Sequence, residues 1–529
     1  MKGGTAPRAR YLRDDQIGTI RMRQAVNREH RHDVRAAWDR SSALASSVFQ
    51  NSGRLAGALE QVITDTVGTG LVLNARPDWT NVRGGDRTEF IRIVERRWRQ
   101  WSNNPIECDL RGKQTIDQMI DTFIRWYLTY GEFFSLMPYM NPSVRQRRGA
   151  QTGLKVCAVN PLRVPRVTRE MEGLYEGIWH DAEGMPTHLR VREYRDGIWQ
   201  QDDHRMRDNT GLSLAHHGMM GESGDVRGIT PMAPAIKDWL TYDQATDSTN
   251  ALLLIQSLFA ATLKSGALDR DALEGILTFA DELGQKDGYA SEDGNLPLDY
   301  LLNRYESAAE KGIHVGEHGR INVLAPGDEF QFHTPGGSAQ SYMPLATNMM
   351  RSVARCLGIT FSSFAMDHNG ATYTSVRMET STIWPVAVRR KSRLAAPAKQ
   401  AIYEAWLDEE VGEGRIPFPG GYRAFRAQRH AICAAEWIGP AKPVADDLKA
   451  AKAASERLAN RTSTNEDEIQ ERGGDPESIF ERQLLEHQRF IENGMTSPYE
   501  RNPSATGADG AFDGNGDPVQ DARLGESTA

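Results

Sequence analysis

Few residues of this 529-residue chain have the types and spacing that catalysis or nucleotide binding requires. Gly112-Lys113 is similar to the end of a phosphate-binding loop of the Walker type. However, Gln114 stands where a Ser or Thr should hold magnesium, and Glu107 occupies the position of the first glycine. We therefore expect that the chain alone does not hydrolyse ATP.

Two further patterns are similar to metal sites but lack essential ligands. The stretch from Asp513 to Asp517 is similar to the start of a calcium loop, yet Pro518 replaces the glycine that the turn requires, and no Glu stands at the twelfth position. His216 and His217 are adjacent, so in a strand they point to opposite faces and cannot bind one metal together. The sequence predicts no metal and no cofactor.

The chain also lacks the motifs of common hydrolases. It contains no GxSxG nucleophile elbow and no HExxH zinc motif. Carboxylates are frequent in residues 265–310 and could include a general acid–base pair, but a solvated acidic face is the commoner role of such a stretch. We expect a protein that is not an enzyme.

Composition and charge indicate a soluble protein of several domains. Hydrophobic residues make up 39% and charged residues 25% of the chain, and its length favours two to four domains. The net charge of −8 is unlike that of a sequence-reading DNA-binding protein. The most apolar run, residues 251–263, is shorter than the roughly 20 residues that span a bilayer, so we expect no membrane segment. The four scattered cysteines indicate free thiols.

A helix–loop–helix pattern over residues 335–405 organises the rest of the chain. Apolar residues recur every four positions on one helix face, and Gly358 should end that helix. Residues 359–369 show no helical period. A second helix should begin near 372–375 and continue to about 407, although Pro385 and Pro397 must kink or interrupt it. The apolar stripe of the first helix is Leu345, Met349, Val353 and Leu357.

Before this pattern, the chain favours a mixed domain followed by a long helix. Residues 1–35 are basic and are predicted to form a flexible arm. Residues 36–230 should form an α+β domain, with helices at 36–67, 88–101 and 116–130, strands at 71–73 and 133–137, and an antiparallel sheet within 153–218 that includes residues 162–167. A helix is predicted from 231 to 264, and short strands at 312–315, 320–324 and 330–332. The apolar anchors of that helix include Ile236, Trp239 and Leu240.

After the second long helix, a Gly/Pro-rich connector leads to short helices that extend to about residue 495. Thr464 and Asp475-Pro476 have the residue types that begin helices. From residue 496 onward the chain is rich in Gly, Asp, Ser, Pro and Asn, which predicts a disordered tail. The overall fold class is therefore α+β and mainly helical.

Several ordered sequence blocks resemble the lambda family of phage portal proteins. The resemblance covers roughly residues 36–495 and is strongest in a few blocks. The blocks are Val67-Gly68-Thr69-Gly70-Leu71, Gly131-Glu132-Phe133-Phe134, Arg227-Gly228-Ile229-Thr230-Pro231, Ala325-Pro326-Gly327-Asp328, Arg351 to Ile359, Tyr373-Thr374-Ser375-Val376-Arg377 with Trp384, and Trp437 to Asp475.

This resemblance implies a ring of twelve subunits at a unique capsid vertex in the virion, assembled in the host cytoplasm. The implied partners are double-stranded DNA, the terminase large subunit, the major capsid and scaffolding proteins, and the head–tail connector proteins. The DNA would pass through the ring without sequence-specific contacts. The implied regions are a wing (36–230), stem helices (231–264 and 338–357), a clip (265–337), a tunnel loop (358–376), a long wing helix (377–407) and C-terminal wing and crown helices (408–495).

The resemblance also implies site residues. Stem packing would use Leu345, Met349, Val353, Leu357, Ile236, Trp239 and Leu240. The tunnel loop facing DNA would comprise Ile359, Thr360, Phe361, Ser362, Ser363, Phe364, Ala365, Met366, Asp367, His368, Asn369 and Gly370. Because this loop has little apolar anchorage, we expect it to be mobile, and its deletion from Phe364 to Ala371 should spare ring assembly while impairing DNA packaging or retention. The alternatives are a head-morphogenesis enzyme, such as a nuclease or protease, and a helical scaffold protein.

Overall fold

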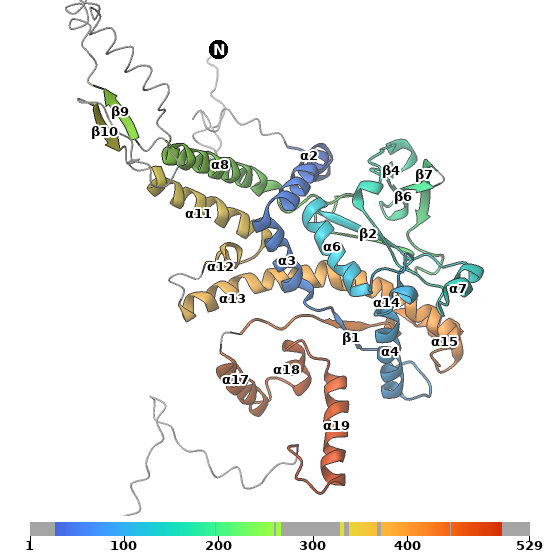
Figure 1. Ribbon diagram of the computed structural model, residues 1–529. Coiled ribbons are helices and arrows are strands. Elements are labelled where there is room, and N and C mark those ends of the chain that lie inside the picture. The colour runs from blue at the N-terminus through green and yellow to red at the C-terminus, as the bar shows by residue number, and fades with distance from the viewer. Residues whose placement is uncertain are drawn as a thin grey trace, which may run out of the picture. The chain divides into compact units, whose positions relative to one another are not determined.

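The computed structural model describes residues 27–195, 197–258, 261–265, 328–332, 338–367, 372–444 and 446–499. It divides into two compact units (Figure 1). The first unit combines the chain up to Pro231 with the chain from His368 onward, and the second comprises Met232–Asp367. Both are built mainly from helices with small antiparallel sheets, as the sequence predicts. The predicted strands at 312–315 and 320–324 and nearly all of the arm and tail lie outside the described residues.

The first unit begins with two helices where the sequence predicted one. Helix α2 spans His30–Asn51 and α3 spans Gly53–Val67. Between them Ser52 is extended, and its side chain accepts a hydrogen bond from a backbone N–H of the first turn of α3. The prediction of one helix over 36–67 was therefore wrong, because Ser52 starts a new helix as an N-cap. The arm was also predicted too long, since α2 already includes residues 30–35.

The next helices agree with the sequence prediction. Helices α4 (Arg87–Ser102) and α6 (Ile116–Tyr130) are confirmed, and a short helix α5 (Pro105–Cys108) lies between them. Helix α6 begins with a capping box at Thr115 and ends at Gly131, whose φ is +89°. A Cβ at Gly131 would lie 2.1 Å from the backbone carbonyl carbon of Ile229, so only glycine fits where these two chain segments approach each other.

Two antiparallel sheets follow α6 and contain most of the predicted strands. In the first, β2 (Glu132–Leu136) lies between β3 (Cys157–Val159) and β8 (Ala215–Met219). The second has the order β4-β5-β6-β7. The strands of this second sheet are β4 (Leu174–Tyr175), β5 (Ile178–His180), β6 (Pro186–Arg195) and β7 (Ile198–Arg205). A core between the two sheets includes Phe134, Val159, Ile178, Leu189 and Val191.

One predicted strand in this region was wrong. Residues 162–167 do not join a sheet, and Pro161–Arg163 forms the 3-10 helix η1. The Asn160 side chain caps this turn, and Pro161 and Pro165 have no N–H to donate to a strand ladder. The other short elements here are helix α7 (Pro142–Arg148) and the 3-10 helix η2 (Glu170–Glu172).

A further strand pair joins distant parts of the first unit. The predicted strand at 71–73 is confirmed as β1 (Val72–Ala75), and it pairs antiparallel with β11 (Ala435–Ile438). The sequence analysis predicted only helices in the region of β11. It missed this strand because four residues carry little periodic signal, and the partner strand lies far away in the sequence.

The long helix after residue 372 is confirmed with an interruption. Helix α13 spans Tyr373–Arg390, a π-helical turn spans Lys391–Ala395, and α14 spans Ala396–Gly412. Pro385 lies inside α13, whereas the π turn ends two residues before Pro397. Since proline has no N–H for the regular bond, the helix widens there and continues beyond the predicted end at 407.

The remaining helices of the first unit range from 4 to 17 residues. Thr464 and Asp475 are confirmed as N-cap residues. No residue of α17, α18 or α19 is buried in this chain. These last helices are α15 (Gly421–Ala427), α16 (Arg429–Ile432), α17 (Asp447–Ala459), α18 (Asn465–Glu471) and α19 (Pro476–Glu492).

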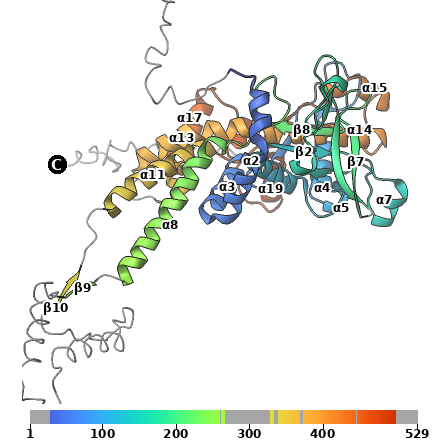
Figure 2. The same cartoon turned by 90° about the horizontal axis from the view of Figure 1, so that it is seen from above.

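The second unit is a helical hairpin with a strand pair (Figure 2). Its elements are the 3-10 helix η3 (Ala233–Ala235), α8 (Ile236–Leu258), β9 (Ala261–Ser265), β10 (Asp328–Phe332), α11 (Ser338–Leu357) and α12 (Phe361–Ala365). The helix predicted over 231–264 was too long, because residues 261–265 pair with β10 as a strand. Helix α11 and the strand at 330–332 agree with the prediction.

None of the described helices is long and apolar enough to cross a membrane.

Candidate channel-lining segment

Helices α8 and α11 pack against each other and bury part of the predicted stem stripe. Val353 and Leu357 are completely buried, and Trp239 is 3% exposed. By contrast, Leu345 is 51% exposed and Leu240 is 39% exposed. The predicted stem residues therefore divide into side chains that pack within the chain and side chains that are exposed in the single chain.

Polar contacts fix the register of the helix pair. Ser352 donates a hydrogen bond of 2.6 Å to Asp238 Oδ2, near the buried end of the hairpin. Farther along, the hydroxyl groups of Thr246 and Tyr342 lie 2.6 Å apart. Because these pairs join opposite helices at two levels, they oppose sliding of α11 along α8.

The segment after α11 is more ordered than the sequence predicted. Gly358 adopts a φ of +70° and ends α11 as expected. The chain then forms the short helix α12, with Thr360 as its N-cap. Ile359 is 3% exposed and Phe364 is 4% exposed, and the Phe364 ring packs edge-on against Trp239 at 6.2 Å. The expectation that this segment has little to bury was therefore wrong, because two of its apolar side chains anchor it to the helix pair.

The exposed part of the predicted loop is correspondingly small. Met366 adopts a φ of +52° and is 81% exposed, and Asp367 beside it is also exposed. The guanidinium group of Arg351 lies 5.1 Å from the centre of the Phe361 ring and covers it. The half-buried residues of the segment are Thr360, Phe361, Ser362, Ser363 and Ala365, and the predicted residues His368, Asn369 and Gly370 lie outside the described part of the chain.

A buried charge cluster, which the sequence analysis did not identify, holds the first unit together. Glu132 on β2 is fully buried and accepts hydrogen bonds from Arg227 Nε at 2.7 Å and from the Gly228 N–H at 3.1 Å. Its Oε2 also lies 3.0 Å from His217 Nε2. Burial raises the pKa of Glu132, but Arg227 and His217 more than offset this effect and hold it at about 2. The carboxylate is thus ionised at neutral pH and links three segments of chain.

The two adjacent histidines point to opposite faces of β8, as predicted. His217 stacks on Phe134 with ring centres 4.3 Å apart, whereas His216 contacts Phe133. Burial, together with the nearby His217 and Arg207, lowers the pKa of His216 to about 4. The imidazole of His216 is therefore neutral at physiological pH and serves packing.

The described cysteines are all unpaired thiols. Burial raises the pKa of Cys108 to about 12, so it is not a ready nucleophile at neutral pH. Among the residues that the structure describes, no group of three or more His, Cys, Asp or Glu side chains is arranged to hold a metal ion.

Comparison with known proteins identifies the family. The family described as "Phage portal protein, lambda family" matches residues 18–391, well over half of the chain. This chain belongs to the lambda family of phage portal proteins. It is 22% identical to Portal protein B of Escherichia phage lambda over 467 residues, which cover 87% of this chain and 85% of that protein. It is 23% identical to the Portal protein of Escherichia phage N15 over 471 residues, which cover 87% and 86% of the two chains.

Among solved structures, the neck of a native gene transfer agent (GTA) particle, computed with C12 symmetry, is similar at a TM-score of 0.40. The identity is 13%, and the match covers 83% of this chain and 94% of that chain. As a member of the phage portal family, the chain is a structural component of the capsid rather than an enzyme. The alternative of a nuclease or protease is thereby excluded.

Proposed function

We propose that twelve copies of this portal protein form a ring at a unique capsid vertex and that double-stranded DNA is packaged and ejected through it. The observation that carries this proposal is the α8–α11 hairpin, which leaves large apolar side chains uncovered in a chain of a ring-forming family. The proposed wing, clip and crown retain the boundaries that the family resemblance implies, whereas the first stem helix is shortened to α8.

The exposed apolar side chains of the stem helices favour a second copy of the same chain as their partner. Met343 is 61% exposed and Leu345 is 51% exposed on α11, while Leu240 is exposed on α8. Burying apolar surface provides the main favourable term in protein association. A ring repeats one such heterologous contact around its axis, so each hairpin would cover exposed apolar side chains of the next.

The segment at residues 359–370 would lie at the bore of the ring. It contains no Lys or Arg, and its exposed tip includes Asp367. A bore lined with basic side chains would bind phosphates tightly, whereas this composition and the net charge of −8 favour passage of a duplex. In the proposed ring, this tip would contact the DNA that passes through the bore.

The other proposed partners follow from the same assembly. The clip region, residues 265–337, would dock the terminase large subunit during packaging and the head–tail connector proteins later. The wing would contact the major capsid and scaffolding proteins during assembly in the host cytoplasm. No sequence-specific DNA contact is proposed.

Electron microscopy of the purified, negatively stained full-length protein tests the assembly. The proposal predicts rings with a central hole of duplex width, and native mass spectrometry should give the mass of twelve chains. A compact monomer, or an open filament without a hole, would contradict it.

A further inference from the structure

Helix α7 lies at the edge of the first unit, beside the turn at residues 109–114 (Figure 1). The Arg148 guanidinium donates a hydrogen bond of 2.6 Å to the carbonyl oxygen of Leu110 and so joins the end of α7 to the turn. Residues 138–156, which include α7, contain four basic residues and no acidic one, although the net charge of the chain is −8. We call the exposed cations of the helix and the turn the α7 patch: Arg111, Lys113, Arg147 and Arg148.

The two acidic residues that precede the turn bind backbone N–H groups. Asp109 is 5% exposed, and its carboxylate accepts hydrogen bonds of 2.8–3.1 Å from three N–H groups of the turn. Glu107 accepts from the N–H groups of Gln151 and Thr152 at 2.8 and 3.1 Å. Within the part of the chain that the structure describes, no carboxylate forms an ion pair with a side chain of the α7 patch.

The positive charge of the patch acts on neighbouring titratable groups. Burial is the main cause that lowers the pKa of Lys155, and the like charge of Arg148 lowers it further, although Glu107 opposes this effect. On β3, burial raises the pKa of Cys157, and the positive charge of Arg111 offsets part of that rise. Because like charges close together repel one another, an anion bound at the patch would lower the electrostatic energy of this surface.

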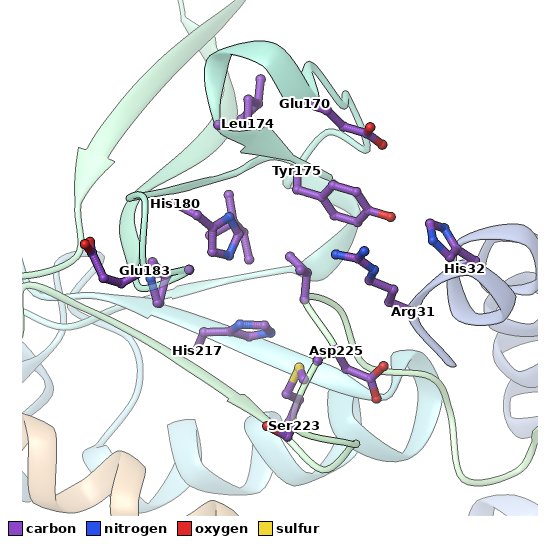
Figure 3. A pocket seen from close by; sticks show the side chains of 17 residues that line it. Arg31, His32, Glu170, Leu174, Tyr175, His180, Glu183, His217, Ser223 and Asp225 are labelled. Carbon is purple, nitrogen blue, oxygen red and sulfur yellow. The ribbon is translucent and has the colours of Figure 1, made fainter. Parts of the chain in front are cut away.

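Several other arginines of the first unit have partners within the chain. Arg31 lines a cavity of about 840 Å³ (Figure 3), where it forms an ion pair with Glu29 and lies 5.6 Å from the centre of the Tyr175 ring. Arg190 donates to both carboxylate oxygens of Asp203, at 2.7 and 2.8 Å. The cations of the α7 patch differ from these, because an external anion can pair with them.

The surroundings of the patch favour a phosphate backbone over an acidic protein surface. The centres of protein interfaces are rich in large apolar and aromatic side chains. Among residues 110–114 and 141–151, all of which the structure describes, no large apolar side chain is exposed. Three of the four patch cations are arginines, whose planar fork of N–H donors matches the oxygens of a phosphate group.

We propose that the α7 patch binds the phosphate backbone of double-stranded DNA without reading its sequence. The choice of DNA rests on the proposed function, because that function brings a duplex to the assembled ring. The patch belongs to the first unit, whereas Met366 and Asp367 of the proposed bore belong to the second. The patch is therefore a DNA contact in addition to the bore.

Binding of a closed circular duplex to the assembled full-length protein tests this proposal, because a closed circle has no end that could enter the bore. Filter binding over a range of salt concentrations measures the affinity and its salt dependence, and two circles of different sequence should bind equally. Replacing all four patch residues by Gln should weaken binding about tenfold or more at about 0.1 M salt. The slope of the logarithm of affinity against that of salt should become shallower by about 3–4, since each lost phosphate contact contributes about 0.9.

A second variant keeps the test decisive if loss of the hydrogen bond between α7 and the turn disturbs the fold. Lys113→Glu combined with Arg147→Glu leaves that bond in place, so the circular dichroism spectrum should stay unchanged while binding weakens several-fold. The matched control is Arg96→Glu combined with Lys452→Glu, which makes the same change of charge at exposed positions of α4 and α17. This control should bind the circle as the parent protein does.

The proposal is overturned if the parent protein does not bind the circle, or if the Lys113→Glu, Arg147→Glu variant binds as tightly as the control. It is also overturned if a poly-glutamate peptide binds the patch and DNA does not, since the partner would then be an acidic protein. Native mass spectrometry of the same samples reports ring assembly separately. Rings that form but bind no circle contradict only the patch, whereas patch-dependent binding by chains that form no ring contradicts only the proposed assembly.

Discussion

At the scale of single residues, the buried pair of Glu132 and Arg227 carries the sharpest stability prediction. Both side chains are fully buried, so replacing Arg227 by Met leaves an uncompensated carboxylate. We expect Arg227→Met to lower the free energy of unfolding by about 3–5 kcal/mol. The matched control is Arg125→Met, because Arg125 and its partner Glu60 are both well exposed, and its cost should stay below about 1 kcal/mol. Thermal unfolding followed by circular dichroism measures both variants. If Arg227→Met and Arg125→Met lose the same free energy of unfolding, the role assigned to the buried pair is contradicted.

The same pair predicts an acid-dependent loss of stability. The folded pKa of Glu132, about 2, lies below its ordinary value of 4.5. Its ionised form therefore stabilises the fold above pH 4.5, and this contribution is lost as the pH falls towards 2. Unfolding temperatures measured across this window should fall for the parent protein. In Arg227→Met the dependence should be weaker or reversed, because burial then raises the pKa of Glu132.

For the buried carboxyl group of Glu95, we expect a pH dependence of stability with the opposite sign. Burial raises its pKa to about 7, although the Ala75 N–H donates to it at 2.8 Å. A raised folded pKa gives a stabilising contribution that is complete below pH 4.5 and is lost as the pH rises to about 7. Glu95→Gln should therefore raise the unfolding temperature at pH 8 by a few degrees and leave it nearly unchanged at pH 4. Glu436→Gln, an exposed carboxylate on the paired strand β11, serves as the control and should change neither value.

At the scale of elements, α11 is expected to have two separable roles. Leu357 is fully buried within the chain, so Leu357→Ala should destabilise the subunit by about 2–5 kcal/mol. Leu345 is half exposed, so Leu345→Glu should leave the helical content of the chain intact while shifting the oligomer towards monomers. Circular dichroism and native mass spectrometry separate the two effects. Rings that persist in Leu345→Glu would show that this face of α11 does not contact a neighbouring subunit.

The anchoring of α12 changes how the channel segment should be deleted. The deletion from Phe364 to Ala371 removes a buried ring that packs on Trp239, so it would disturb the helix pair itself. Removing only residues 366–371 and joining the ends with a short glycine linker keeps Phe364 in place. We expect this variant to form rings yet to package or retain less DNA, measured as nuclease-protected DNA per particle. Failure to form rings would mean that these residues belong to the subunit contact.

Local signals explain which elements could be predicted from the sequence. The apolar stripe ending at Leu357, the stop at Gly358 and the cap at Thr372 are encoded within a few residues, and the structure has helices at those places. In contrast, α12 was missed because Phe364 is anchored by Trp239, a residue far away in the chain. The Glu132–Arg227 pair was missed for the same reason, since 95 residues separate its partners.

At the scale of the whole molecule, the account depends on identical subunits placing their helical hairpins side by side around an axis. The family membership and the uncovered apolar face of the α8–α11 pair support that arrangement. The ring in turn gives the exposed tip at Met366 and Asp367 its proposed position at the bore.

Cryo-electron microscopy of the assembled full-length protein, at a resolution that traces α11 and α12, tests this central claim most directly. The account predicts a closed ring of twelve chains in which Met366 and Asp367 face a central bore of duplex width. A ring in which these residues lie on the outer surface, or a particle without a central bore, would contradict it.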